Sequence, residues 1–497
     1  MQRNGKGGGL RGWLAAGLVL AAAGPARAED SWDAVYLAGA KIGSVHTFVE
    51  PVKDGARQLL RVRIDSELSF KRLKDRVVMK FQYGTIETPE GQVLSLDTRT
   101  LASDVEMQVH GKVVDGKMKL MFDGTGQKQE QTIDWGSDVR GPHAAEQSLS
   151  RQPMKPGEVR PIKMFMPELN KVCDLTLTAK SVEEIPLGGG TKRPLLRIEQ
   201  ATLLQGKPRP EFDVTLWVDN GGQVLKSSTD NFGGMVQYRT TREGALAAPA
   251  GAGAQYDQIL NTVVKVRRKI PRPDSTRDVS YLVTLKGESP ADVFPVDRRQ
   301  TLRPGSKANE SVLVVKTAGP NDGVPEAAPD DSFLRPNAMI TCEDGRVVGL
   351  ARKAVGDATD PWEKAKRIER YVAKNLRDKN FAVAFAPASE VAKNLSGDCT
   401  EHGVLTAAMC RAEGVPARVA VGLVYVDSLG GFGFHLWNEV YVNRRWVAID
   451  ATFEQDDVDA VHIKLGDSSL DGVSPFESLL PIVRVLGKLS IDATEIR

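Results

Sequence analysis

Three side chains in the last quarter of the chain have the types and the order that thiol chemistry requires. Cys399 follows Gly397-Asp398 at the start of a predicted helix, and His435 and Asp450 follow on two predicted strands. A thiol, an imidazole and a carboxylate can serve as nucleophile, base and orienting acid in acyl transfer. The amides and dipole of a helix N-terminus favour the thiolate and could also help to hold an oxyanion. We therefore predict these three residues as the catalytic site.

The spacing of the two predicted strands decides whether His435 and Asp450 can meet. If Asn443-Arg444 forms a two-residue turn, Trp437 lies opposite Asp450. His435 is then on the same face and diagonal to Asp450, and such neighbours, roughly 7–8 Å apart, are within reach of an imidazole–carboxylate hydrogen bond. A three-residue turn would place the two side chains on opposite faces. The predicted triad therefore requires the two-residue turn, although a turn with glycine would adopt positive φ more easily.

The surrounding sequence predicts the elements that carry these residues. Asp360-Pro361-Trp362-Glu363 has the features of a helix start, with Asp as N-cap, Pro at the first position and Glu closing a capping box. A second helix is predicted from Asp398 to Glu413, and Gly414 and Pro416 end it. The strands predicted after it are Val419–Val426, Phe434–Val442 and Arg445–Ile449. Helices followed by antiparallel strands indicate an α+β domain.

The N-terminal half has the pattern of mostly antiparallel β structure. From Trp32 to about Arg242, short alternating runs are separated by turn residues such as Asp219-Asn220-Gly221-Gly222. We expect a sandwich or a half-open barrel here. The clearest strands of this part are predicted at Val35–Leu37, Leu59–Ile64, Val77–Phe81, Leu175–Leu177 and Leu195–Ile198. A second β-rich segment, from about Tyr256 to Thr317, contains predicted strands at Val279–Leu285 and Ser311–Val315.

The chain, 497 residues long, should contain two or three domains. We predict a signal peptide at 1–28, a β-rich domain at 29–243, a linker at 244–255, a smaller β-rich domain at 256–317, a second linker at 318–331, the α+β catalytic domain at 332–470 and a C-terminal extension at 471–497.

The N-terminal segment predicts export to the periplasm or secretion. It combines basic residues, an apolar run from Trp13 to Ala23 and the cleavage pattern Ala26-Arg27-Ala28. The alternative, an uncleaved membrane anchor, is disfavoured because the apolar run is short for a span. Removal of residues 1–28 moves the net charge from +2 to −2, which gives no electrostatic case for nucleic acid. No later apolar run predicts a membrane span, and four cysteines are too few for a disulfide framework.

The region from about Asp360 to Leu465 resembles the transglutaminase-like superfamily, whose members have a papain-like core. The resemblance is carried by Gly397–His402, Arg411–Val419, His435–Val440 and Trp446–Thr452. It implies a transglutaminase-like α+β domain, which follows the mostly antiparallel β N-terminal part predicted from the strand pattern. It also implies that the nucleophile, base and orienting acid are Cys399, His435 and Asp450. We expect no cofactor.

Other interpretations of these residues are open. Zinc could in principle be held by Cys399, His402, His435 and Asp450, but a single thiolate without a CxxC pair disfavours a metal site. His402 could be a second base, although helix packing or contact with substrate is favoured. Trp437 and Tyr441 share the face of His435, as shields of the site or as core. We expect Gly430–Gly433 to be a mobile loop, Cys410 to be core, and His46, His110, His143 and His462 to be structural or exposed.

The expected activity is thiol-dependent acyl transfer on a protein or peptide, with hydrolysis favoured over transfer to an amine. The alternative is a non-catalytic envelope protein that holds a peptide or glycan in the same cleft. A third possibility is that the β-rich N-terminal part acts as a scaffold or inhibitor of the domain behind it.

Overall fold

The computed structural model describes residues 28–102, 105–124, 127–187, 192–230, 234–248, 256–376, 386–471 and 475–497. The predicted signal peptide and most of the predicted linker at 244–255 lie outside these ranges. The first residues of that linker belong to a short helix, α2 (Arg242–Leu246), whose N-cap Thr241 accepts a hydrogen bond from the Gly244 N–H. Within the described residues, no helix is long and apolar enough to span a membrane.

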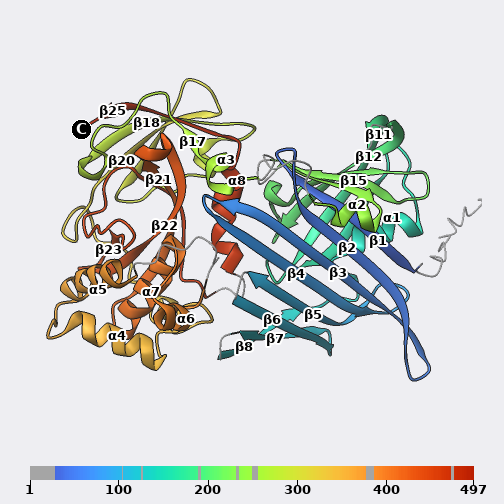
Figure 1. Ribbon diagram of the computed structural model, residues 1–497, viewed down its shortest axis with the longest axis horizontal. Coiled ribbons are helices and arrows are strands. Elements are labelled where there is room, and N and C mark those ends of the chain that lie inside the picture. The colour runs from blue at the N-terminus through green and yellow to red at the C-terminus, as the bar shows by residue number, and fades with distance from the viewer. Residues whose placement is uncertain are drawn as a thin grey trace, which may run out of the picture.

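The N-terminal part is one large sheet, drawn from blue to green in Figure 1. Its described residues form sixteen strands in the order β8-β7-β6-β5-β4-β3-β2-β1-β16-β15-β14-β12-β11-β10-β9, with β13 beside β12. Their bounds are β1 (Glu29–Leu37), β2 (Ala40–Asp54), β3 (Arg57–Arg72), β4 (Asp75–Glu87), β5 (Val93–Ala102), β6 (Val105–Val114), β7 (Lys117–Gly124), β8 (Gln127–Asp134), β9 (Val139–Arg140), β10 (Val159–Met166), β11 (Lys171–Pro186), β12 (Lys192–Leu204), β13 (Lys207–Pro208), β14 (Val214–Val218), β15 (Val224–Thr229) and β16 (Met235–Thr240). The pairings are antiparallel except β9 with β10.

This sheet curls, because side chains from its two ends share a core. Met118 and Leu120 of β7 pack with Val139 of β9 and Phe165 of β10. Strands at opposite ends of the hydrogen-bonded order can meet in this way only if the sheet bends round. The prediction of a mostly antiparallel β N-terminal part is confirmed.

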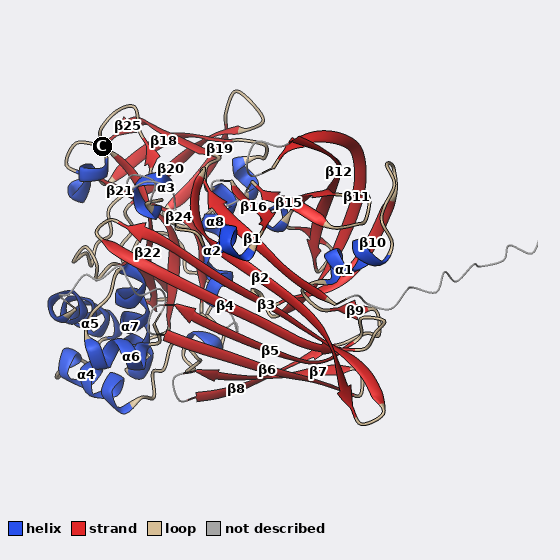
Figure 2. Ribbon diagram, turned by 45° about the vertical axis from the view of Figure 1, so that its right-hand side comes forward, coloured by secondary structure: helices blue, strands red, loops and turns tan. Residues whose placement is uncertain are grey.

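The C-terminal part combines two further sheets with a group of helices. Figure 2 shows the long helices α4 to α7 gathered at one corner of the molecule. The strands are β17 (Val264–Lys265), β18 (Asp278–Leu285), β19 (Gln300–Pro304), β20 (Glu310–Lys316), β21 (Ala417–Val426), β22 (Gly431–Val442), β23 (Arg445–Ile449), β24 (His462–Ser468) and β25 (Leu489–Ile496). The helices are α1 (Ala144–Arg151) in the N-terminal part, α3 (Gln258–Thr262), α4 (Gly345–Val355), α5 (Pro361–Asn375), α6 (Ala388–Asn394), α7 (Cys399–Ala412) and α8 (Leu480–Val485).

One sheet joins segments from both ends of the C-terminal part. Its order is β19-β20-β18-β25. β18, from the predicted smaller β-rich domain, therefore pairs with β25, the last strand of the chain. Val283 of β18 and Ile491 of β25 belong to the same buried cluster as Ile368 of α5 and Val404 of α7. The segments 256–317 and 471–497 therefore share a core with the helices, while the boundaries proposed above stay a prediction.

The helices begin where their sequence signals place them. Asp360 caps α5 by accepting a hydrogen bond from the Glu363 N–H at 2.9 Å, with Pro361 as the first helical residue. The Glu363 side chain, predicted to close a capping box, pairs with Lys366 and Arg367. One face of α5 with its C-cap is buried, formed by Ala365, Ile368, Val372 and Leu376, and Cys410 of α7 is buried as predicted.

Candidate active site

The first turn of α7 holds Cys399 in a defined position. The carboxylate of the N-cap Asp398 accepts hydrogen bonds from the N–H and hydroxyl of Thr400, at 2.9 and 2.8 Å. Glu401 reaches back to accept from the Asp398 N–H at 3.0 Å, which completes a capping box. Gly397 has a φ of +147°, and a Cβ there would lie 2.4 Å from Glu401. The Gly-Asp-Cys order thus starts the helix and leaves Cys399 as its first residue.

Close packing of α7 on β22 brings Cys399 to the strand that carries His435. A Cβ on Gly403 would lie 2.0 Å from the Leu436 side chain, so only glycine allows this approach. Asn438 of β22 donates a hydrogen bond to the Gly403 carbonyl at 2.9 Å. The backbone N–H of Leu436 faces the Cys399 sulfur closely enough to lower the pKa of the thiol. The thiol therefore lies against the residue that follows His435.

The β22–β23 hairpin has the register that the predicted triad requires. Val442 lies opposite Arg445, so Asn443 and Arg444 form a two-residue turn. Their φ angles are 48° and 62°. Positive φ at both central positions characterises a type I′ turn, the form that matches the twist of a hairpin. The predicted register is confirmed, even though neither turn residue is glycine.

Asp450, just after β23, accepts hydrogen bonds from two histidines. Its Oδ2 accepts from Nε2 of His435 at 2.6 Å and from Nε2 of His462 at 3.1 Å. Its Oδ1 accepts from the Thr452 N–H at 2.7 Å. The carboxylate is 1% exposed. These bonds fix both oxygens of Asp450 and leave Nδ1 of His435 as the ring nitrogen not turned to the carboxylate.

His462 was expected among the structural or exposed histidines, and that prediction is incomplete because the residue lies inside the site. It is 1% exposed, and its Nδ1 bonds to Asp459 Oδ1 at 2.7 Å. Both of its ring nitrogens face carboxylates, which can only accept, so both bonds form fully when the ring is doubly protonated. The sequence contained no register signal for His462, because its position depends on the pairing of β24 with β21.

The charges around the site follow from these contacts. Burial would raise the pKa of Asp450, but the adjacent His435 and His462 hold it well below its usual range. Burial would lower the pKa of His462, but its bonds to Asp450 and Asp459 raise it. Burial and the nearby Asp398 raise the pKa of the Cys399 thiol well above its usual value. This differs from the expected thiolate at a helix N-terminus, because the thiol is buried and because the cap is itself an anion.

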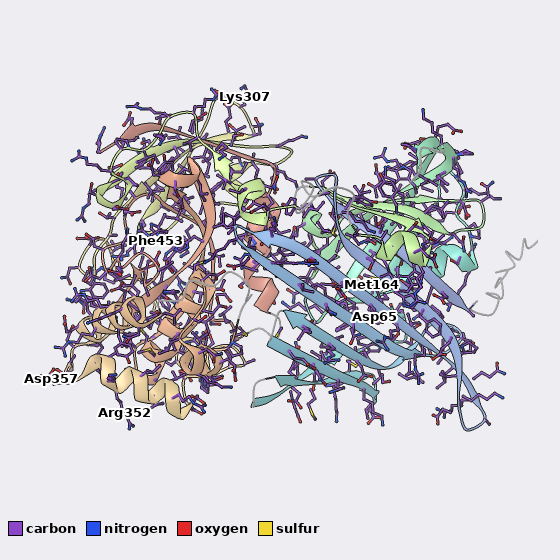
Figure 3. The ribbon with its side chains drawn as sticks, in the orientation of Figure 1. Asp65, Met164, Lys307, Arg352, Asp357 and Phe453 are labelled. Carbon is purple, nitrogen blue, oxygen red and sulfur yellow. The ribbon has the colours of Figure 1, made fainter. Side chains whose placement is uncertain are left out.

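Two aromatic rings contact the His435 ring. Trp437, 1% exposed, stacks on His435 with ring centroids 6.1 Å apart, and Phe453 meets it edge-on at 5.1 Å. Phe453 is 40% exposed and lies just after β23 (Figure 3). Trp437 is therefore part of the wall of the site, whereas Tyr441, farther along β22, donates to the Glu326 carbonyl at 2.9 Å.

Two other predictions on this region are settled by the backbone and by a side-chain contact. Most of the predicted mobile loop is strand, since Gly431 to Gly433 belong to β22 and Gly431 pairs with Lys265 of β17. His402 is 1% exposed, and its Nδ1 lies 2.7 Å from the carbonyl oxygen of Asp398. That contact ties the ring to the start of its own helix.

Three side chains are close enough together to bind a metal ion, but they are not the four residues considered from the sequence. Among the described residues, ligand atoms of His435, Asp450 and His462 lie within 4.8 Å of one another, and all three residues are buried. The atoms already satisfy each other through hydrogen bonds, since the Asp450 carboxylate accepts from both rings. The arrangement therefore suits proton transfer through His435.

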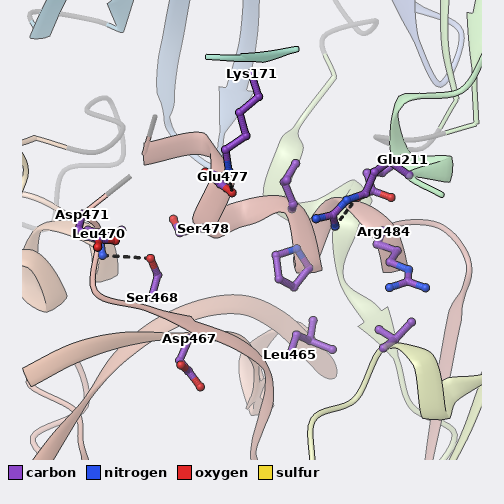
Figure 4. Close-up of a pocket in the computed structure, with 14 residues that line it drawn as sticks. Lys171, Glu211, Leu465, Asp467, Ser468, Leu470, Asp471, Glu477, Ser478 and Arg484 are labelled. Carbon is purple, nitrogen blue, oxygen red and sulfur yellow. Dashed lines mark hydrogen bonds and ion pairs between the residues drawn. The ribbon is translucent and has the colours of Figure 1, made fainter. Parts of the chain in front are cut away.

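A cavity lies elsewhere, between the large sheet and the C-terminal part (Figure 4). It has a volume of about 470 Å³, and neither Cys399 nor His435 lines it. Among its charged side chains, Lys171 contacts Glu477 at 2.5 Å, and Arg209 contacts Glu211 at 3.4 Å. Asp467 and Arg484 pair with Arg418 and Glu288, which lie outside the lining.

Comparisons with known proteins find one matching family and several similar structures. The model of the transglutaminase-like superfamily matches residues 348–451. Among solved structures, a Cytophaga hutchinsonii protein with the provisional name of cysteine protease is 16% identical over 44% of this chain and 86% of its own, with a TM-score of 0.28. The periplasmic domain of TgpA from Pseudomonas aeruginosa is 12% identical over 39% and 92%, with a TM-score of 0.25.

A third structure is a β-barrel-like protein of unknown function from Brucella abortus. It is 14% identical over 43% of this chain and 96% of its own, with a TM-score of 0.31. No curated protein sequence is similar enough to this chain to count as a relative. Residues 348–451, which include Cys399, His435 and Asp450, are therefore a transglutaminase-like domain.

Proposed function

We propose that this protein is a thiol-dependent hydrolase of peptide or carboxamide bonds. The observation that supports it most directly is the 2.6 Å hydrogen bond from His435 Nε2 to Asp450 Oδ2. His435 lies on β22, the strand that also approaches the Cys399 sulfur. The bond orients the ring and leaves Nδ1 for the thiol. A transglutaminase-like domain also favours a protein or peptide as the substrate.

In the first step, Nδ1 of His435 takes the thiol proton as the Cys399 sulfur attacks the carbonyl carbon. The raised pKa of this thiol means that proton transfer accompanies attack. The backbone N–H of Cys399 would donate to the oxyanion, because the next amide, of Thr400, is already bonded to Asp398. Collapse breaks the C–N bond, and His435 returns the proton to the leaving amine.

In the second step, a water molecule loses a proton to His435 and attacks the thioester. The C–S bond breaks, the acid product leaves, and the thiol regains its proton. Asp450 stabilises the imidazolium in both steps without taking its proton. An amine in place of water would give a transglutaminase, and hydrolysis is favoured because an exported enzyme meets abundant water. Export itself is proposed from the N-terminal segment 1–28.

The test compares the protein starting at Glu29 with its Cys399→Ala variant. A quenched-fluorescence peptide library measures hydrolysis, and a fluorescent primary amine offered with a glutamine-rich protein measures transfer. Cys173→Ala, a buried cysteine of the large sheet, is the matched control. We expect hydrolysis in the wild type and control, none in Cys399→Ala, and no effect of a chelator. Equal hydrolysis by Cys399→Ala would refute the proposal.

Iodoacetamide gives a test that needs no substrate. Cys399 is partly exposed, whereas Cys173, Cys342 and Cys410 are buried. Because burial raises the pKa of both Cys399 and Cys410, the exposure of the sulfur decides the order of reaction. Mass spectrometry should therefore find Cys399 alkylated first. If the thiol reacts but no peptide or amide is cleaved, the non-catalytic binding function becomes the better explanation.

A further inference from the structure

The tip of the β3–β4 hairpin of the N-terminal sheet reaches the start of α7. Arg72 is the last residue of β3, and its Nη2 lies 2.8 Å from Asp398 Oδ2. The Asp398 side chain is 1% exposed and that of Arg72 is 18% exposed. Because Asp398 directly precedes Cys399, a residue from the other half of the protein forms part of the surroundings of the nucleophile.

The hairpin is held in this place by backbone pairing. The Lys71 N–H donates to the Tyr256 carbonyl at 2.9 Å, and Lys71 forms a parallel bridge with Asp257. The chain then continues through α3 into β17, where Val264 pairs with Phe432 of β22. The segment 256–265 thus connects the hairpin that carries Arg72 to the strand that carries His435. In Figure 1 the blue strands β3 and β4 run toward this junction.

The charges facing the thiol explain what Arg72 contributes. On its own helix, Cys399 has the carboxylate of Asp398 as its immediate neighbour and Glu401 one turn on. Burial and Asp398 raise the pKa of Glu401 to about 8, so this group is mostly uncharged at neutral pH. From β22 the site receives the His435 ring. From the N-terminal sheet it receives the guanidinium of Arg72, whose charge opposes the effect of Asp398 on the thiol.

We propose that Arg72 is a positioning residue of the candidate active site: by pairing with Asp398, the N-terminal sheet supplies the charge that keeps the Cys399 thiol reactive. The large sheet is then a required part of the catalytic unit. The inference rests on the proposed function only in taking Cys399 as the nucleophile. A reactive thiol whose state depends on Arg72 can be measured without any substrate.

The expected effect is a change in the pH profile of Cys399 alkylation. Arg72→Ala leaves the buried Asp398 unpaired beside the thiol, and we expect the profile to move up by about one pH unit. One unit reduces the thiolate fraction tenfold, but a more basic thiolate is about threefold more nucleophilic. The net result at pH 7 is alkylation about threefold slower. Arg72→Lys keeps the charge and should restore most of the profile.

Arg76→Ala is the matched control. It removes one positive charge from the same hairpin, but Arg76 is exposed and donates to Ser69 at 2.7 Å. Its alkylation profile should match the wild type. Asp398→Asn removes the carboxylate while keeping a capping side chain. If Arg72 acts through Asp398, adding Arg72→Ala to Asp398→Asn should shift the profile much less than in the wild type.

The outcomes separate this proposal from the proposed function. An unchanged alkylation midpoint in folded Arg72→Ala would overturn the inference. Faster alkylation would also overturn it, because the hairpin would then restrict access of the reagent to Cys399 and would not promote its reactivity. Thermal unfolding of each variant checks that the protein is folded, and a shift equal in Arg72→Lys and Arg72→Ala would indicate a purely structural role. Loss of peptide hydrolysis in Cys399→Ala is a separate readout and does not depend on Arg72.

Discussion

Replacing His462 with glutamine tests whether this residue orients Asp450. Glutamine can donate from its amide to one carboxylate, but it cannot serve both Asp450 and Asp459 and it carries no charge. A hydrogen bond to a charged group contributes about 1.5–3 kcal/mol. If the bond of 3.1 Å from His462 is what steadies Asp450 as His435 gains its proton, its loss should reduce kcat/KM by about 10- to 100-fold.

The same variant predicts a specific dependence of stability on pH. The pKa of His462 is raised in the folded protein, because the bonds to Asp450 and Asp459 outweigh the effect of burial. A raised pKa means that the charged ring stabilises the fold fully below the ordinary histidine pKa of about 6.5. This stabilisation is lost as the pH rises through the raised value. The thermal midpoints of wild type and His462→Gln should therefore differ most near pH 6 and converge at alkaline pH.

The assay combines kcat/KM on a peptide substrate, alkylation of Cys399 and thermal unfolding from pH 6 to pH 9. His110→Gln is the control, since His110 also bonds an aspartate, Asp97 at 2.6 Å, but on the exposed face of the large sheet. It should leave all three readouts unchanged. The reasoning about His462 is refuted if His462→Gln keeps kcat/KM within twofold of the wild type. It is also refuted if its stability deficit is the same at every pH.

Three further changes test the framework of the site. Asp450→Asn removes the acceptor that orients the base and should lower kcat/KM on the order of 10³-fold with the protein folded by circular dichroism; activity near the wild-type value would exclude the proposed role. Gly422→Ala places a Cβ 2.0 Å from the Ile463 carbonyl oxygen, so we expect a loss of about 2 kcal/mol or more in denaturant unfolding, and an unchanged midpoint would contradict this. Burial would raise the pKa of Glu439, but the Lys464 ammonium at 2.8 Å helps to lower it to about 2. A lowered pKa stabilises the fold above pH 4.5, and this stabilisation is lost as the pH falls toward 2. The free energy of unfolding should therefore fall by about 3 kcal/mol over that range, and Glu439→Gln should show a flatter dependence of stability on acid pH.

Local sequence patterns were enough to predict the parts of the site that depend on nearby residues. The helix start at Cys399 follows from Gly397 and Asp398, which act within one turn of chain. The register of the β22–β23 hairpin follows from a two-residue turn and the alternation of side chains, so the pairing of His435 with Asp450 could be derived by counting. In both cases the interacting groups are few residues apart, and the chain itself limits how they can be placed.

The tertiary structure alone decided what surrounds that core. His462 reaches Asp450 because β24 pairs with β21 through an irregular register at Val421 and Gly422, and alternation cannot predict a register shift. Gly431 joins a strand because the distant segment Val264–Lys265 pairs with it. In the same way, Arg72 meets Asp398 across more than 300 residues of sequence. The sequence by itself therefore determined which groups could act. The pairing of separate segments decided which charges lie beside them, because each such contact depends on how both of its segments are placed in the fold.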